Sequence, residues 1–567
     1  MKKWTLWSFT CFLGIPWFII GTLGGIYVKY WYCSNYTRRT FRINGMEDVK
    51  DILLYAFLFM LFVFLLNLLH VSDKKPIGLF TWLSKYKYEP EETSSRKRKA
   101  QYPLVDSEYL SEEPNQMPLG KQNGKYVQFN IDSCLSLLIF GSPGAGKTTL
   151  LLSLVLYQLW IKREPGEIAP ALFIFDFKGG ELYRKSCLPN NSKTRFISLE
   201  NRKHWGWNPY YRLNANSSDD EVIRELTLLA DVIIDSGNDK NAFFTESAKN
   251  ILIFVGLYDF KISKKKSFIG TIDRLTAGDL SSVLKEVVED CDNKLDMKKI
   301  YDTLAEYVAS DDGNEALNNI KMTIKQKTRV FKVDDVRWAL EYNPRRASPE
   351  DLEKGISLFF YPGDPNVTDV VLKMIAKQLE YHTLHRDYMN LKGKGPLRNI
   401  VVVADECYTI GKAVDYTNWA SKARAYKTTL IMIWQSFSQI KEIFGNDKPG
   451  SLLDDVDGIA VLAVNSPQNA EQFVDFAGQY FEEKRSISEG SSEEGKSTLS
   501  YEDKHILTKQ DFLTLKKNKE VILLMNGKYF RVDSEAARYY KIPELKEISD
   551  KCLKVQMRYE GKPDKEV

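Results

Sequence analysis

A glycine-rich loop beginning at residue 141 lies between an apolar strand-like run and an apolar helix-like run. The run Leu137–Phe140 leads into GSPGAGKT (residues 141–148), and the apolar segment Thr149–Trp160 follows. The glycines of such a loop let successive backbone N–H groups surround phosphate oxygens, and the N-terminus of the next helix adds positive potential. The pattern predicts a nucleotide-binding site, formed by Gly141, Ser142, Pro143, Gly144, Ala145, Gly146, Lys147, Thr148 and Thr149.

Catalysis at such a loop requires acidic residues as well. Lys147 is expected to reach the β- and γ-phosphates, and the Thr148 hydroxyl to ligate Mg²⁺. The apolar strand in NIVVVADE (residues 399–406) ends in two carboxylates on what we expect to be a neighbouring strand. We expect Asp405 to hold Mg²⁺ through water and Glu406 to polarise the attacking water as general base. The alternative is an acidic pair that only caps a helix.

Two other polar stretches follow predicted strands. The strand Thr429–Ile433 leads to Gln435, at the position where RecA-like motors place a residue that senses the γ-phosphate; a surface glutamine is the alternative. The segment DFKGGEL (residues 176–182) contains Asp176, Lys178 and Glu181, whose roles the sequence leaves open. We expect Asp176 to end a strand beside the P-loop strand, where it would either cap a turn or act in catalysis.

The body of the chain alternates strand-like and helix-like runs, as in α/β folds with a mainly parallel sheet. This rhythm stops between residues 215 and 345, where helical, amphipathic segments predict an all-α inserted domain. The nucleotide-binding domain therefore comprises residues 120–214 and 346–540, preceded by a linker at 76–119 and followed by a C-terminal tail at 541–567. Residues 482–503, rich in Ser, Glu, Gly and Lys, are expected to form a mobile loop.

The N-terminus contains two long apolar stretches. Trp4–Val28 and Ile52–Val71 contain no charged residue, and each is long enough to cross the ~30 Å hydrocarbon core of a membrane. We predict a retained anchor of two transmembrane helices (residues 4–28 and 52–71, within 1–75) rather than a cleaved signal peptide. Positive charge on both flanks favours cytosolic termini, although the loop between the stretches is also basic. The basic run Arg96–Lys99 is either a solvated linker or a contact with anionic lipid.

Composition adds two limits. The 79 basic and 75 acidic residues nearly balance, so the net charge of the chain does not by itself indicate that it binds nucleic acid. The seven cysteines are scattered and only five histidines are present, which argues against a structural metal site and for reduced thiols in a cytosolic body.

Taken in order, these motifs resemble the type IV coupling proteins of conjugation and type IV secretion, the TraG/TraD group. The resemblance rests on two N-terminal spans, GSPGAGKT, DFKGGEL, WNP (207–209), VVVADE, WQSFSQIKEIFG (434–445) and SPQNAEQFVDFAG (466–478). The family usually reads D-x-K-G-E-L, whereas this chain contains an extra glycine. DFKGG is also similar to FtsK-type DNA translocases and type VII secretion ATPases.

The resemblance implies a multi-pass protein of the cell (inner or cytoplasmic) membrane whose cytosolic ATPase domain is RecA-like and hexameric. It implies that ATP hydrolysis drives a DNA–relaxase complex or a protein substrate into a type IV secretion channel. DNA contact would be sequence-independent, and the all-α domain would contact substrate. It also implies an arginine finger from the neighbouring subunit, best matched by Arg424, for which a surface salt bridge is the alternative. Two other functions remain open: an FtsK-type or type VII-like translocase, and a nucleotide-binding receptor without significant turnover.

Overall fold

The computed structural model describes most of the chain beyond residue 101. The described residues are 102–561, except 114–115, 134, 161–165, 236–241, 264–265, 310–312, 387–396, 446–447, 489–495 and 526, together with a few isolated positions before residue 59. The chain divides into two compact units, Met1–Lys97 and Arg98–Val567. The predicted spans at 4–28 and 52–71 lie almost wholly outside the described residues. Among the described residues, no helix has the length and apolarity needed to cross a membrane.

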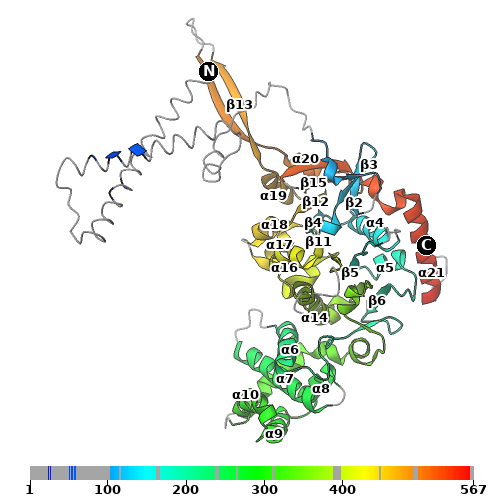
Figure 1. The fold of residues 1–567 in the computed structure, drawn as a ribbon, viewed down its shortest axis with the longest axis vertical. Coiled ribbons are helices and arrows are strands. Elements are labelled where there is room, and N and C mark those ends of the chain that lie inside the picture. Colours follow the sequence, from blue (N-terminus) through cyan, green and yellow to red (C-terminus); the bar gives the residue numbers. More distant parts are fainter. Residues whose placement is uncertain are drawn as a thin grey trace. The chain divides into compact units, whose positions relative to one another are not determined.

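A single large sheet organises the second unit (Figure 1). Its order is β1-β3-β2-β16-β15-β12-β4-β11-β10-β5-β9-β6. From β12 to β6 in this order the strands are parallel, whereas β15 and the strands beyond it pair antiparallel. The strands are β1 (Leu110–Ser111), β2 (Met117–Gln122), β3 (Lys125–Phe129), β4 (Leu137–Gly141), β5 (Ala171–Phe175), β6 (Thr194–Ser198), β9 (Ser357–Tyr361), β10 (Ile400–Ala404), β11 (Thr428–Trp434), β12 (Gly458–Ala463), β15 (Glu520–Met525) and β16 (Lys528–Asp533). The α/β fold with a largely parallel sheet is as the sequence predicts.

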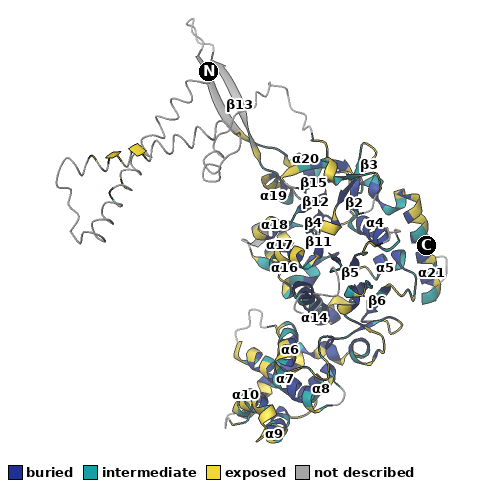
Figure 2. Ribbon diagram, in the orientation of Figure 1, coloured by how far each residue is buried: buried dark blue, intermediate teal, exposed yellow. Residues whose placement is uncertain are grey.

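Helices cover both faces of this sheet, and the central strands are buried throughout (Figure 2). Alternate side chains of β4 enter two different cores, with Leu137 and Ile139 on one face and Leu138 and Phe140 on the other. This two-sided burial explains why the parallel strands are continuously apolar. The helices that flank the sheet are α4 (Lys147–Trp160), α5 (Glu181–Ser186), α14 (Pro365–Leu384), α15 (Cys407–Ile410), α16 (Tyr416–Ala423), α17 (Phe437–Phe444), α18 (Lys448–Asp454), α19 (Pro467–Ala477), α20 (Lys509–Leu513) and α21 (Pro543–Glu560).

A helical region interrupts the sheet between β7 (Gly206–Trp207) and β8 (Arg346–Ala347), which pair in parallel at its base. Within the predicted range 215–345 the described residues form helices and contain no strand. The α-helices there are α6 (Asp219–Ile233), α7 (Ala242–Ile262), α8 (Phe268–Ala277), α9 (Leu280–Cys291), α10 (Lys298–Ala309), α11 (Gly313–Lys327) and α12 (Asp334–Arg337). Figure 1 shows α6 to α10 gathered together below α14.

The base of this region contains buried polar contacts. The Trp207 indole donates to Gln378 Oε1 at 2.8 Å, and the Gln378 amide donates to the buried Glu225 carboxylate of α6 at 2.9 Å. Glu225 also pairs with Arg212 at 2.7 Å. These bonds join α6 to α14 of the sheet domain.

Three segment predictions require correction. The linker predicted at 76–119 ends too late, because β1 and β2 already belong to the sheet and β2 turns into β3 through Asn123 and Gly124, both with positive φ. The loop predicted at 482–503 lies largely within a hairpin of β13 (Gln479–Ser488) and β14 (Lys496–His505), whose backbone groups pair with each other despite the polar sequence. The C-terminal tail contains α21, which packs on α4 and α5 through a buried face that includes Leu545, Cys552 and Met557.

Candidate nucleotide-binding site

The P-loop connects the buried strand β4 to α4 at the carboxyl edge of the parallel strands. Gly144 and Gly146 adopt positive φ values of 77° and 85°, which glycine tolerates best. The Ser142 amide donates to the carbonyl of Ala463 at the end of β12, at 3.1 Å. The Ser142 hydroxyl is buried and has no hydrogen-bond partner among the described residues. The loop therefore has the backbone conformation and an unused polar group that suit a phosphate ligand.

Lys147 begins α4 and its ammonium remains inside the loop. It donates to the carbonyl oxygen of Gly141 at 2.5 Å and to that of Ser142 at 3.4 Å. Burial and the nearby Lys178 ammonium lower the pKa of Lys147. Lys178 in turn donates to the Thr148 hydroxyl at 2.5 Å. Two ammonium groups thus lie next to the loop, and an anionic ligand would relieve their mutual repulsion.

The two predicted acidic residues stand directly after β10. Asp405 is buried, and burial raises its pKa while Lys178 and Lys147 act in the opposite direction. Its Oδ1 atom has no hydrogen-bond partner among the described residues. Glu406 Oε1 accepts a hydrogen bond of 2.9 Å from the side-chain amide of Gln435. The structure thus brings Lys147, Asp405, Glu406 and Gln435 to the same edge of the sheet.

The strand order differs from the expected one in two respects. We expected the strand of Asp176 to lie beside the P-loop strand, but the neighbours of β4 are β11 and β12, and β5 lies beyond β10. The acidic pair also does not follow an immediate neighbour of β4, because β11 lies between β4 and β10. Gln435 directly follows β11, so the strand order places its side-chain amide between the P-loop and Glu406.

The residues of DFKGGEL have separate local roles. Asp176 is fully buried and accepts a hydrogen bond of 3.1 Å from the Tyr183 amide, and burial raises its pKa to about 7. Glu181 pairs with Lys185 one helical turn later, at 2.7 Å. The extra glycine also has a structural reason, because Gly180 caps α5 with a φ of 76° and a Cβ there would lie 2.5 Å from the Phe196 ring. Lys178 is the member of this segment that contacts the P-loop.

Arg424 is not part of this cluster. It lies at the end of α16, is exposed, and precedes β11 by only a few residues. β11 is seven residues long. At about 3.3 Å per residue it separates the two edges of the sheet by roughly 23 Å, so Arg424 lies far from Gln435 of its own chain.

Two residues that contact the P-loop were missed by the sequence analysis. Asn518 donates from its side-chain amide to the Gly144 carbonyl at 3.2 Å, and Arg538 donates to the Gly146 carbonyl and to the Thr149 hydroxyl. Both lie more than 370 positions away in sequence from the residues they contact. No local motif marks either residue.

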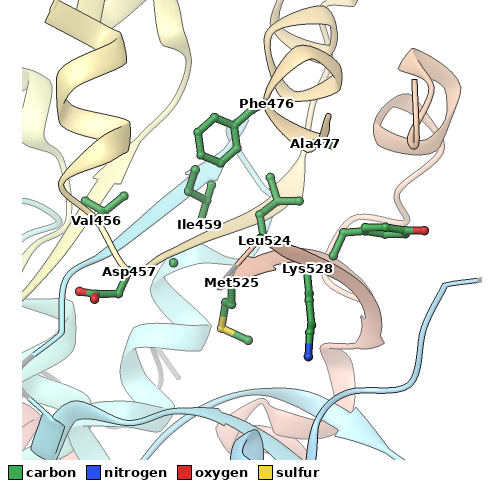
Figure 3. A pocket seen from close by; sticks show the side chains of 11 residues that line it. Val456, Asp457, Ile459, Phe476, Ala477, Leu524, Met525 and Lys528 are labelled. Carbon is green, nitrogen blue, oxygen red and sulfur yellow. The ribbon is translucent and has the colours of Figure 1, made fainter. Parts of the chain in front are cut away.

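A cavity of about 270 Å³ lies elsewhere, at the opposite end of β12 (Figure 3). Its lining includes Gly458, Ile459, Leu524, Met525 and Lys528. Gly458 pairs with Leu137 at the start of β4, whereas the P-loop follows the end of that strand. This cavity is therefore separate from the P-loop.

Comparison with known proteins identifies the family. Residues 95–561 match the profile of the family described as Type IV secretory system Conjugative DNA transfer. The chain belongs to this family. It is accordingly a type IV coupling protein, in agreement with the resemblance of its motifs. A search among curated proteins gives no match.

Solved structures agree on the fold. The unbound bacterial conjugative coupling protein TrwB lacking its N-terminal segment matches with a TM-score of 0.52 at 15% identity, covering 73% of this chain and 88% of that chain. TrwB in complex with ADP and Mg²⁺ matches with a TM-score of 0.53 at 15% identity, covering 75% of this chain and 90% of that chain. At this identity the likeness establishes a shared fold.

Proposed function

We propose that this coupling protein is a membrane-anchored, hexameric ATPase that drives a DNA–relaxase complex or a protein substrate into a type IV secretion channel. The observation that supports it most strongly is the convergence of Lys147, Thr148, Asp405 and Glu406 at one edge of the sheet, in a chain of the conjugative DNA transfer family. TrwB, which shares the fold, has been crystallised with ADP and Mg²⁺ and with a non-hydrolysable ATP analogue.

Each site residue has a defined task in this proposal. The P-loop amides and Lys147 bind the phosphates. Thr148 and Asp405, whose Oδ1 atom has no hydrogen-bond partner among the described residues, would hold Mg²⁺, which supplies charge neutralisation on the phosphate oxygens when bound. Glu406 accepts a proton from the attacking water. The Gln435 amide already holds one Glu406 oxygen at 2.9 Å and so orients the other toward the reacting water.

The test uses full-length protein in detergent. Lys147→Ala should abolish hydrolysis, because the charge that neutralises the phosphates is lost, whereas Lys441→Ala, on α17, should leave it unchanged. Glu406→Gln should still bind Mg²⁺ and ATP, since its amide oxygen can accept the hydrogen bond from Gln435. It should turn over poorly, because an amide cannot accept the proton of the attacking water. Wild-type turnover in Glu406→Gln would remove the general-base role. Absence of hydrolysis by wild-type protein in assembled transfer complexes would favour a nucleotide-binding receptor.

Arg424 is proposed to act on the nucleotide of a neighbouring subunit. Its exposure and its distance from its own P-loop support action in trans, and a guanidinium suits the charge that builds on the γ-phosphate. Arg424→Ala should bind ATP but lose hydrolysis roughly 10³-fold or more, while Lys422→Ala on the same helix should not. Mixing Arg424→Ala with Lys147→Ala subunits should restore part of the activity. Mixed hexamers that stay inactive would exclude a finger in trans.

The membrane anchor is proposed on the two apolar N-terminal stretches and their flanking charges. Cys33 should then react with an impermeant thiol reagent applied to cells whose envelope admits it. Cys407 is an unsuitable control because it is fully buried and burial raises its pKa. A cysteine placed at the exposed position Ser421 is the proper cytosolic control, and its labelling in intact cells would reverse the topology.

A further inference from the structure

Two side chains outside the phosphate-binding motifs contact the outer side of the P-loop. Asn518 lies just before β15 and Arg538 lies just after β16. Because these two strands are antiparallel, with Glu520 opposite Asp533, the start of one and the end of the other meet. The carbonyl of Lys519 accepts from the amides of Ser534 and Glu535 and so ties the two segments together.

Both residues bind backbone carbonyls of the loop. Asn518 donates to the Gly144 carbonyl at 3.2 Å, and Arg538 Nη1 donates to the Gly146 carbonyl. In a phosphate-binding loop the N–H groups point inward, so the carbonyls between them must point outward and need donors elsewhere. The two side chains supply such donors at alternate residues, which favours the loop conformation that binds phosphate.

Arg538 has a second property, an uncompensated charge. Its side chain is fully buried, and among the described residues it forms no ion pair; its Nε and Nη2 atoms are buried without hydrogen-bond partners. Burial lowers its pKa to about 10, so it remains protonated at neutral pH. Arg386, which is also fully buried, is by contrast paired with the Glu353 carboxylate. A buried guanidinium without a carboxylate is costly unless an anion lies nearby.

Two further distances show how close Arg538 lies to the P-loop. Its Nη1 atom is 3.1 Å from the Thr149 hydroxyl in the first turn of α4. A Cβ added to Gly146 would lie 3.2 Å from the guanidinium carbon. The backbone of Arg538 is itself held, since its amide donates to Glu535 at 3.1 Å and its carbonyl accepts from Lys541 at 2.9 Å.

We propose that Arg538 is a positioning residue for nucleotide: it holds the P-loop in its phosphate-binding conformation and adds a buried positive charge that attracts the phosphates. Asn518 assists by fixing the adjacent carbonyl. This inference rests on the proposed function, in which the P-loop binds nucleotide. It makes the segment after the last strand of the sheet a part of the nucleotide site.

The test measures binding of Mg²⁺-ADP and of pyrophosphate to ligand-free, full-length protein in detergent by calorimetry. Arg538→Gln keeps an N–H donor but removes the charge, and should weaken both ligands roughly ten- to hundredfold. Arg538→Lys keeps the charge without the planar fork and should lie between Gln and wild type. Arg531→Gln, on β16, is the matched control: its arginine pairs with Glu520 and should not affect either affinity.

Asn518→Gly tests the same idea without altering a buried charge. The backbone at this position has a φ of 63°, which glycine accepts, so only the donor to Gly144 is lost. A loss of roughly three- to tenfold in affinity is expected. If Arg538→Gln does not fold, Asn518→Gly provides the test of the inference. Affinities of Arg538→Gln within twofold of wild type, or unchanged affinity of Asn518→Gly, would overturn the inference. Failure of wild-type protein to bind Mg²⁺-ADP would instead overturn the proposed function.

Discussion

Replacing Glu353 by Gln is expected to destabilise the protein strongly, because it leaves Arg386 charged and buried without a carboxylate. Glu353 accepts from Arg386 Nε at 2.8 Å and from Nη2 at 2.7 Å. Arg386 is fully buried, and within the described part of the chain its other hydrogen bonds go to the backbone carbonyls of Tyr426, Lys427 and Arg398. Three neutral acceptors cannot replace the charge of the carboxylate.

Breaking a buried ion pair by removing one partner typically costs about 3–5 kcal/mol. Gln is nearly isosteric with Glu and can still accept one hydrogen bond, so the lower part of this range applies here. A loss of about 3 kcal/mol should lower the melting midpoint by roughly 3 °C, because an unfolding entropy of about 2.1 cal/mol/K per residue amounts to about 1 kcal/mol/K for the unit Arg98–Val567. Intrinsic tryptophan fluorescence of the full-length protein reports the transition.

The pH dependence of the same pair has a defined sign. Burial alone would raise the pKa of Glu353, but hydrogen bonds from His382 and Arg386 outweigh it and leave the pKa below 4.5. A depressed pKa means that the pair stabilises the protein above the unfolded value and that this contribution is lost as pH falls below about 4.5. The difference between wild type and Glu353→Gln should therefore shrink as pH falls through the folded pKa.

The matched control is Glu471→Gln, which removes a carboxylate from an exposed pair with Lys509. Exposed pairs contribute about 1 kcal/mol or less. Combining Glu353→Gln with Arg386→Gln should be less harmful than the sum of the single changes, because no orphaned charge remains. If Glu353→Gln melts no lower than Glu471→Gln, the argument from the buried charge is refuted.

Three other changes have outcomes that follow from local geometry. Gly180→Ala should destabilise the protein by about 2–4 kcal/mol, because it combines left-handed backbone strain with a clash against Phe196. Gly179→Ala is the control: its Cβ would meet the Arg184 side chain at 3.6 Å, so it should lower the stability less in the same melting assay. Asp176→Asn should stabilise the ligand-free protein more at pH 8 than at pH 5. The Asp176 carboxyl has a pKa of about 7 in the folded protein, so it stays protonated at pH values where the unfolded chain already ionises. The free energy of unfolding of the wild type therefore falls as pH rises from about 4 to 7, by about 4 kcal/mol at most. An equal gain at both pH values would contradict this. Cys407 should resist maleimide until the protein unfolds, as mass spectrometry of the labelled peptide would report, and rapid native labelling would show that α15 opens.

Much of the site could be predicted from sequence because its main groups follow apolar strands directly. A strand buried on both faces is continuously apolar, so Leu137–Phe140 and Ile400–Val403 are visible as runs, and the polar residues that end them must meet at the carboxyl edge of a parallel sheet. The P-loop and the acidic pair are local patterns of this kind. The helical region interrupting the sheet was visible for a similar reason, since its helices change the hydrophobic period.

Features that depend on strand order or on pairing between distant segments could not be predicted. The place of β11 between β4 and β10 is decided by packing of whole strands, and no residue within β4 or β5 specifies it. The hairpin of β13 and β14 is stabilised by backbone pairing, which a polar sequence does not reveal. Likewise, α21 was missed because its buried face is interrupted by Ser549 and Gln556, which are buried against the rest of the domain.

Local sequence patterns are sufficient to predict a phosphate-binding loop, an acidic pair after a buried strand, and a helical region between two parts of a sheet. The three-dimensional arrangement is needed to show that Gln435 lies next to Glu406, that Arg424 lies at the far edge from its own P-loop, and that Arg538 lies against Gly146. The physical reason is that local patterns set the conformation and burial of each segment. Which distant side chains meet is set by the antiparallel return of β15 and β16 beside the parallel strands, a long-range arrangement.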